Sequence, residues 1–310
     1  MFGSPLVRSC VFSSVFVLCV VLAGCAPGGS DTSTPRITDP AFLTDSLWND
    51  GQAEVAFYRV ERSENQYGRP EEQQFLVGTY LVKHTFDRAA MSKAGENPEA
   101  PVSSFKYAQF YELESGSYQY KRSYVVNARQ RDLQPLKASF TSFDWCSNQY
   151  RETAFPEDDH AGWLMRSDDY RNEQMQFAAE GQAYPSAQVP LLIRALDFDT
   201  ADRHQFRVLS GPGSWVRAEA ELAGSDSVAT AAGTFWAERV IVRYEASAPS
   251  TVGETTARQE TYWRTTGPER HLVKLTAESG RYGMELIEVL RSPYWNENIY
   301  DRLQRVAERP

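Results

Sequence analysis

Short runs in which apolar and polar residues alternate recur from about residue 42 to the end of the chain. The runs are rich in aromatic and β-branched side chains and are separated by Gly, Pro, Asn and Asp, which is typical of strands joined by turns. The predicted strands are 54–62, 74–86, 102–115, 117–127, 136–155, 163–166, 173–178, 205–209, 215–222, 234–244, 259–265, 272–278 and 284–290. So many antiparallel strands must curl or close to limit their exposed edges. We therefore predict a mainly β fold, a curved antiparallel sheet or half-barrel.

One predicted strand, 74–86, carries apolar side chains on both faces. Because successive side chains alternate, Phe75 and Val77 share one face, while Leu76 and Tyr80 share the other. A strand with one face in solvent alternates apolar and polar residues, whereas both faces of this strand are partly apolar.

Helices and tight turns are predicted in few places. The best helix candidate is 189–198, where Pro190 occupies a tolerated first-turn position, and a final amphipathic turn or helix covers 295–306. The segment 64–70 predicts a hairpin loop, and a tight turn is expected at Gly116.

The first residues have the layout of a targeting signal. Arg8 and the amino terminus supply positive charge, and 10–22 supply thirteen mostly apolar residues that end in Leu22-Ala23-Gly24-Cys25. A membrane-spanning helix needs about 20 apolar residues, so this run is too short for one. The pattern predicts a signal peptide over 1–24.

The same residues resemble the signal of bacterial lipoproteins, in which the peptide is cut before the cysteine and that cysteine carries lipid. The resemblance implies lipidation of Cys25 and attachment to the membrane through several acyl chains, because one chain binds only marginally. Ala26 stands where aspartate would favour retention, so the resemblance implies transfer to the outer membrane. Whether the body faces the periplasm or the exterior stays open.

The domain boundaries follow from composition. Residues 25–41 comprise the lipidated cysteine and a tether rich in Gly, Ser, Thr, Pro and Asp, a composition that cannot bury enough apolar surface to order itself. Residues 42–310 form a single large β domain, which can also be read as two halves, 42–185 and 186–310.

Charge and cysteine content exclude several classes of protein. The chain has a formal net charge of −9 and lacks a block of Lys and Arg interleaved with aromatics, so we expect no nucleic-acid partner. Cys10 and Cys19 leave with the signal and Cys25 takes the lipid, so Cys146 is the remaining cysteine and an intramolecular disulfide is excluded. Stability must therefore come from a hydrophobic core.

Cys146 is the weak catalytic candidate. In a regular strand over 136–155, Phe143 and Trp145 point to one side, and Asp144 and Cys146 to the other. A nucleophilic cysteine needs a histidine base and an environment that favours the thiolate, and the four histidines are all distant in sequence. An inert buried cysteine is the favoured interpretation.

The densest group of potential metal ligands is Glu157, Asp158, Asp159 and His160. Its spacing matches no defined metal-binding loop, so a solvated turn after Pro156 is favoured over a metal site. We predict neither a metal nor a cofactor.

Aromatic residues make up 13% of the chain and could line the concave face of a curved sheet. The weak candidates for ligand binding are Phe105, Tyr107, Tyr111, Trp145 and Trp236. Such rings can bury an acyl chain or stack on a sugar. The favoured alternative is that they fill the barrel.

Two segments resemble known protein families. Gly233-Thr234-Phe235-Trp236-Ala237 resembles the hallmark strand of a family of periplasmic and outer-membrane β proteins of unknown function, and the likeness covers about the second half of the chain. In the first half, 48–54 and 142–146 resemble motifs of uncharacterised lipoproteins, some labelled septum formation inhibitors. Both resemblances imply a curved antiparallel sheet with the outline of lipoprotein-carrier half-barrels. Neither brings a known catalytic residue.

These observations predict a non-enzymatic lipoprotein of the outer membrane that binds an apolar or amphipathic ligand, or that docks envelope proteins. The expected partner is the membrane, to which the lipid on Cys25 attaches the protein. Two alternatives stay open. One is an envelope hydrolase that uses Cys146 or a metal in the acidic loop, and the other is a purely structural lipoprotein.

Overall fold

The computed structural model describes residues 36–66, 69–115, 118–145, 147–157, 159–249, 256–278, 280, 282–296 and 298–307. The contacts between residues group the chain into two units, of which Arg36–Pro310 is the one that contains the described residues. The predicted signal peptide, Cys25, Cys146 and Asp158 lie outside the described residues.

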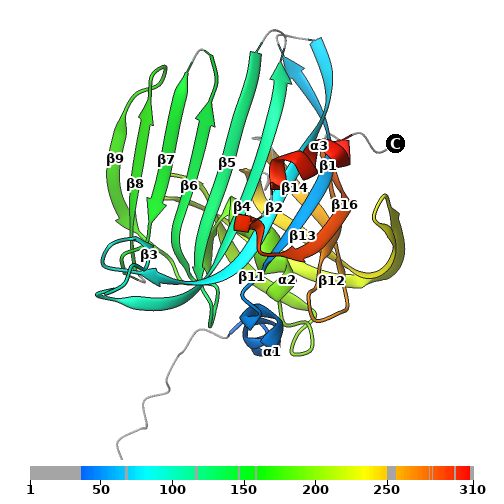
Figure 1. Ribbon diagram of the computed structural model, residues 1–310, viewed down its shortest axis with the longest axis horizontal. Coiled ribbons are helices and arrows are strands. Elements are labelled where there is room, and N and C mark those ends of the chain that lie inside the picture. Colours follow the sequence, from blue (N-terminus) through cyan, green and yellow to red (C-terminus); the bar gives the residue numbers. More distant parts are fainter. Residues whose placement is uncertain are drawn as a thin grey trace, which may run out of the picture. The chain divides into compact units, whose positions relative to one another are not determined.

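Strands dominate the described part, as Figure 1 shows. The strands are β1 Ala53–Gln66, β2 Arg69–Asp87, β3 Ser92–Lys93, β4 Pro101–Ser115, β5 Tyr118–Arg129, β6 Pro135–Phe143, β7 Asn148–Ala154, β8 His160–Ser167, β9 Glu173–Ala178, β10 Ala183–Pro185, β11 Arg203–Gly211, β12 Ser214–Thr230, β13 Gly233–Pro249, β14 Thr256–Thr265, β15 Leu272–Ala277 and β16 Tyr282–Ser292. The α-helices are α1 Pro40–Thr44, α2 Val189–Ala195 and α3 Ile299–Ala307, and the 3₁₀ turns are η1 Ser46–Asn49, η2 Ser186–Gln188 and η3 Tyr294–Asn296.

All these strands belong to one sheet, in the order β10-β11-β12-β13-β14-β15-β16-β1-β2-β4-β5-β6-β7-β8-β9, with β3 beside β2. Within the described residues, β10 pairs parallel to β11, and the other pairs are antiparallel. Because β1 pairs with β16, the two predicted halves are joined through the middle of the sheet. The predicted fold class is confirmed.

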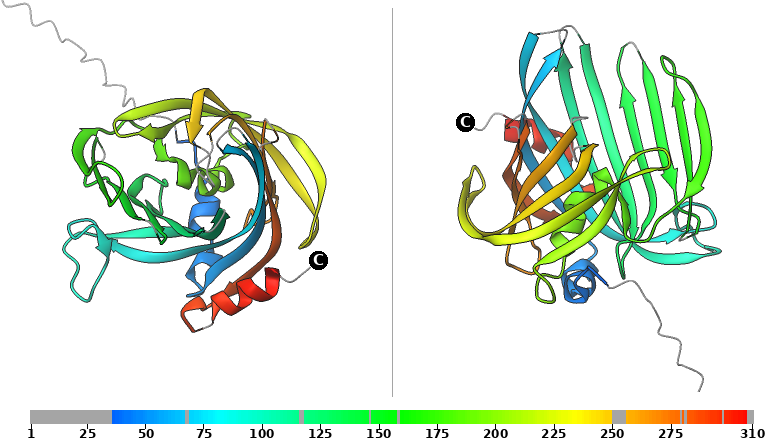
Figure 2. Two further views of the ribbon diagram at one scale, coloured as in Figure 1. Left: turned by 90° about the horizontal axis from the view of Figure 1, so that it is seen from above. Right: turned by 180° about the vertical axis from the view of Figure 1, so that it is seen from behind.

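The sheet curls until its two edge regions meet, as the view from above in Figure 2 shows. Phe177 on β9 packs edge-on against Trp215 on β12, with ring centroids 6.0 Å apart. Arg207 on β11 forms an ion pair with Glu180 at 2.7 Å, just beyond β9. Gly213 turns between β11 and β12 at φ +67°, and a Cβ there would lie 3.3 Å from Phe177 Cβ. Side chains thus bring the edges together.

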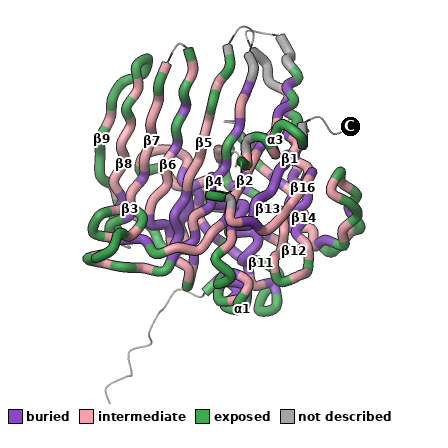
Figure 3. Tube along the Cα trace, viewed as in Figure 1, coloured by how far each residue is buried: buried purple, intermediate pink, exposed green. Residues whose placement is uncertain are grey.

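The buried apolar residues form two separate groups. Figure 3 shows where along the chain the buried residues lie. The concave face holds the main core, which includes Phe75 and Val77 and surrounds α2. On the convex face, Val306 of α3 and Phe57 of β1 belong to a smaller cluster, against which Leu76 and Tyr80 pack. The strand predicted to be apolar on both sides is therefore covered on both sides.

The predicted strand 136–155 is wrong in one respect, because it divides into β6 and β7. Asp144 accepts a hydrogen bond from the backbone N–H of Ser147 at 2.8 Å and so closes a turn between the two strands. Phe143 ends β6, while Trp145 lies in the turn and is 90% exposed. They are consequently not two side chains on one face of a regular strand.

The helix predicted over 189–198 ends at Ala195, because Leu196 turns to an extended conformation and pairs with Thr38. This bridge places the start of the body before the predicted boundary at residue 42. Asp39 explains the earlier start, since its backbone N–H donates to Ala195 O at 2.7 Å and its side chain caps α1. Pro40 follows at the first helical position.

Candidate functional site

Helix α2 lies inside the curved sheet, and all seven of its residues are buried (Figure 2). Its sequence explains this position, because Arg194 is the one charged residue among the apolar Val189, Leu191, Leu192 and Ile193. A helix this apolar is stable only when protein encloses it, and its charged residue then needs a buried partner.

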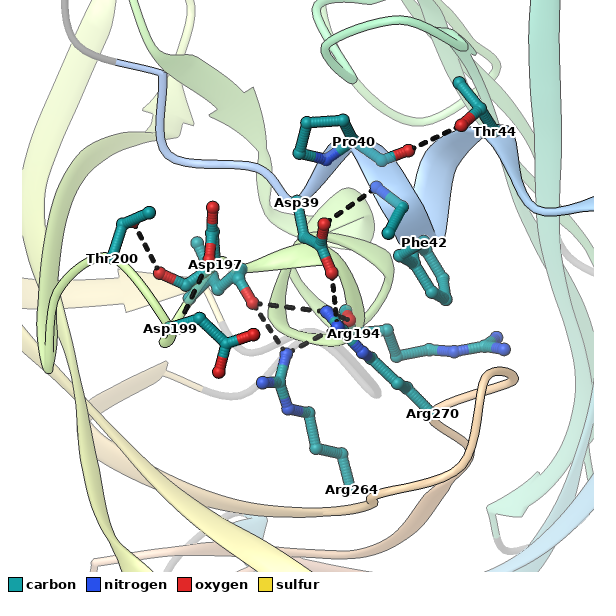
Figure 4. Close-up of polar contacts among 12 residues, drawn as sticks. Asp39, Pro40, Phe42, Thr44, Arg194, Asp197, Asp199, Thr200, Arg264 and Arg270 are labelled. Carbon is teal, nitrogen blue, oxygen red and sulfur yellow. Dashed lines mark hydrogen bonds and ion pairs between the residues drawn. The ribbon is translucent and has the colours of Figure 1, made fainter.

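An arginine from β14 holds the carboxyl end of α2. Arg264 Nη1 donates to the carbonyl oxygens of Ile193 at 2.8 Å, Arg194 at 3.0 Å and Leu196 at 3.0 Å, as Figure 4 shows for the arginine and its neighbours. Its Nε donates to Glu238 at 2.8 Å. The side chain thus satisfies carbonyls that the end of a helix leaves without partners.

A second arginine ties the start of the body to the same helix end (Figure 4). Arg270 forms an ion pair with Asp39 and donates to the carbonyl oxygens of Arg194 and Leu196 at 3.3 and 3.4 Å. Residues far apart in sequence therefore hold the carboxyl end of α2 together.

A buried ion pair joins Glu54 on β1 to Arg194 on α2. Two parallel hydrogen bonds of 2.7 Å join them, and His271 Nδ1 lies 3.2 Å from Glu54 Oε2. Burial by itself would raise the pKa of Glu54, but Arg194 and His271 outweigh burial and lower that pKa to about 2. The carboxylate stays ionised at neutral pH and engages both oxygens, so its role is structural rather than acid–base.

A cavity of about 510 Å³ opens within the curved sheet. One wall is the concave face of β5 to β9, and the opposite wall is the end of β11 with the turn that follows it. Residues of β10 and η2 line it as well. The apolar side chains that line it include Tyr124, Phe140, Trp163, Met165 and Leu209.

Three charged residues, Arg151, Glu152 and Glu173, interrupt this apolar lining. The strand register places Phe140, Arg151, Met165 and Glu173 in one row across β6 to β9, and directly opposed residues share a face. The guanidinium carbon of Arg151 lies 4.0 Å from the centroid of the Phe140 ring. The cavity therefore offers apolar surface with a cation near one side and a carboxylate near the other.

The sequence-predicted aromatic residues fall into two groups. Phe105, Tyr107 and Tyr111 lie on the concave face of β4 and are buried in the core. Trp145 lies in the exposed turn after β6, and Trp236 on β13 is 62% exposed. These five residues do not come together, and none of them lines the 510 Å³ cavity.

The predicted cluster of potential metal ligands lies at the turn before β8. Glu157, Asp159 and His160 are all exposed, and their ligand atoms lie within 4.8 Å of one another. Asp159 accepts a hydrogen bond of 2.8 Å from His160 Nδ1, and this bond raises the pKa of the histidine. The histidine is thus engaged with its neighbour, as in a solvated turn.

Reasoning from the sequence missed the residues that line the cavity. Arg151, Trp163 and Met165 lie on short strands with weak apolar character, and nothing in the local pattern indicates which face is concave. The alternation of side chains in 149–153 and 161–165 could have shown that these residues share one face of the sheet. It could not have shown that this face is the concave one.

Comparisons with known proteins give little beyond the fold. No family model matches the chain, and no curated protein matches it. A similar solved structure is a β-barrel-like protein of the domain of unknown function DUF1849 from Brucella abortus, with 6% sequence identity and a TM-score of 0.47. The match covers 77% of this chain and 97% of that one. Within the described residues, none of the helices combines the length and apolar character that a membrane crossing requires.

Proposed function

We propose that this protein is a non-enzymatic binding protein of the bacterial cell envelope, which holds an apolar or amphipathic molecule inside its curved sheet. The observation that carries the proposal is the cavity of about 510 Å³. Its volume falls within the range of small-molecule sites, which are mostly apolar with a few placed polar groups. The lining combines Tyr124, Phe140 and Trp163 with Arg151 and has this character.

The proposed place of action is the outer membrane, through lipid on Cys25. Support comes from the Leu22-Ala23-Gly24-Cys25 pattern after a short apolar run. Metabolic labelling with radioactive palmitate should label the wild-type chain and leave a Cys25→Ala variant unlabelled. Label on the variant, or unprocessed wild-type chain in the cytosol, would refute this part of the proposal.

Binding can be tested on the chain from residue 26 onward. Native mass spectrometry and solvent extraction should reveal a co-purifying small molecule, and a fluorescent fatty acid should bind with saturation. Ala138→Phe fills the concave wall of β6 and should abolish binding, whereas Thr141→Phe places the same ring on the convex face of that strand and should leave binding unchanged. An empty protein that takes up no probe would end the binding proposal.

A further inference from the structure

A second cavity, of about 470 Å³, lies on the outer side of the sheet. Helix α3 contacts β2 there, and Figure 2 shows this helix outside the curl of the sheet. Ile299 and Leu303 of α3 line the cavity, and because they are four positions apart they share one face of the helix. This outer cavity shares no lining residue with the cavity inside the sheet.

Helix α3 is held in place by residues that do not line the outer cavity. Arg302 Nε donates to Glu288 Oε1 on β16 at 2.6 Å, and Val306 is completely buried in the smaller cluster. The wall that Ile299 and Leu303 form is therefore positioned by contacts outside the cavity.

The floor of the outer cavity includes a glycine in the middle of β2. Gly78 lies opposite Phe57 on β1 and Phe110 on β4, and neither pairing has a bulge there. Its φ lies outside the left-handed region, and a Cβ at this position would be 3.6 Å from the Phe57 ring, an ordinary van der Waals contact. Glycine weakens the interior of a strand and often marks a place where a ligand approaches the backbone closely. Neither backbone conformation nor crowding requires this glycine, so it favours a ligand.

The side chains that line the outer cavity favour an uncharged ligand. Tyr80 and Phe110 stack with their ring centroids 5.7 Å apart and form an aromatic wall. Glu112 and Lys121 form an ion pair with each other at 3.1 Å, so their charges balance. Three further lining residues have side chains that the strand alternation places on the concave face: Thr79, Tyr111 and Arg122. A charged ligand would lose its hydration here without gaining an opposite net charge.

The exposed apolar surface at the outer cavity is too small for a protein partner. Among the large apolar side chains that are exposed in the described part of the chain, Phe110 alone lines this cavity, and it is 42% exposed. Val55 and Phe57, which also line it, are buried. A stable protein interface covers about 800 Å² on each partner, whereas the volume of this cavity is that of a small-molecule site.

We infer that the outer cavity is a second binding site, which takes an uncharged apolar small molecule against Gly78 and the rings of Tyr80 and Phe110. The inference is independent of the proposed function, because the two cavities lie on opposite faces of the sheet and are lined by different residues.

The test uses two fluorescent probes that differ by one charged group, N-phenyl-1-naphthylamine and its sulfonate, 1-anilinonaphthalene-8-sulfonate. The chain from residue 26 onward should bind the uncharged probe at least about tenfold more tightly than the sulfonate. With ¹³C-labelled isoleucine methyl groups, the uncharged probe should shift the NMR signal of Ile299, which lines the outer cavity, and leave that of Ile193 in α2 unchanged.

A matched pair of glycine variants locates the site. Gly78→Val fills the floor and should weaken binding of the uncharged probe by at least about tenfold, while the free energy of unfolding stays equal or rises, because valine suits a strand better than glycine. Gly162→Val adds the same side chain to the convex face of β8, outside the cavity, and should leave binding unchanged. If circular dichroism shows that Gly78→Val is misfolded, Phe110→Ser replaces it and should weaken binding by about tenfold.

The inner cavity supplies the remaining control. Ala138→Phe, which fills the inner cavity, should leave the Ile299 shift intact. If the uncharged probe binds without shifting Ile299, or if Ala138→Phe removes all of its binding, the inference of an outer site fails and the proposed function stands. If the fatty acid does not bind but the Ile299 shift is present, only the proposed function fails.

Two further outcomes would overturn the choice of ligand. Tighter binding of the sulfonate would exclude an uncharged ligand. A wild-type dimer in size-exclusion chromatography that Gly78→Val dissociates would show that a second copy of the chain occupies the cavity.

Discussion

At the scale of single residues, the buried pair of Glu54 and Arg194 shows how this protein tolerates charge in its core. Each side chain is only 5% exposed, and the two are joined by paired hydrogen bonds. Removal of ions from water is expensive, so such a pair adds little net stability but is costly to break. Its geometry fixes how β1 meets α2.

Glu54→Gln should destabilise the protein by about 3–5 kcal/mol, because it leaves the Arg194 guanidinium buried without its counterion. Urea denaturation measures the change. Glu61→Gln, on the exposed side of the same strand, should change the free energy of unfolding by less than about 0.5 kcal/mol. Equal effects of the two substitutions on the free energy of unfolding would show that loss of the ion pair is not the cause.

The same carboxylate predicts a dependence of stability on pH. The pKa of Glu54 is about 2 in the folded protein against an ordinary 4.5, so between these values the unfolded chain binds a proton that the folded chain does not. The contribution of Glu54 is therefore complete above about pH 5 and is lost as the pH falls toward 2. The difference in unfolding free energy between wild type and Glu54→Gln should shrink by the order of 3 kcal/mol over that window. A constant difference would contradict this.

At the scale of elements, α2 depends on a side chain that lies far away in sequence. Arg264 from β14 caps the last carbonyls of the helix, and the chain then turns to the extended Leu196. A seven-residue helix is marginal by itself, so its stability comes from these contacts and from burial.

Arg264→Met should therefore destabilise the protein by about 3 kcal/mol or more, because buried carbonyl oxygens lose their donor. Hydrogen exchange of the α2 amides should accelerate most. Arg258→Met changes an exposed arginine on the same strand and should leave both measurements near wild type. Unchanged exchange in α2 after Arg264→Met would show that burial alone holds the helix.

At the scale of the whole folded unit, the contact between the sheet edges decides whether the sheet encloses a cavity. Phe177 and Trp215 meet across the gap, and Trp215 Nε1 donates to Ala178 O at 3.4 Å. Edge strands invite pairing with other chains, so this contact also shields β9.

Phe177→Ala should loosen the β9 edge, with faster hydrogen exchange in β8 and β9 and a loss of about 1–2 kcal/mol in unfolding free energy. Size-exclusion chromatography should show more self-association of the variant. Phe143→Ala truncates an exposed ring at the end of β6 and should have neither effect. If the β9 amides of Phe177→Ala exchange at the wild-type rate, the ring of Phe177 does not hold the two sheet edges together.

Much of the fold could be predicted from local pattern. The alternation of side chains indicated the strands, and β9 was predicted with its observed bounds. The two apolar faces of 74–86 correspond to the two observed groups of buried residues. These features are local, because the period of two and the turn residues depend only on near neighbours in the chain.

The sequence by itself therefore determined a mainly β protein with its strands and its two-faced strand β2. Only the tertiary structure decided which faces look inward, that Arg151 and Trp163 line a cavity while Trp145 does not, and that Arg264 caps α2. The physical reason is that alternation divides side chains into two faces without saying which is concave. Curvature and closure arise from contacts between residues far apart in sequence, as between Phe177 and Trp215.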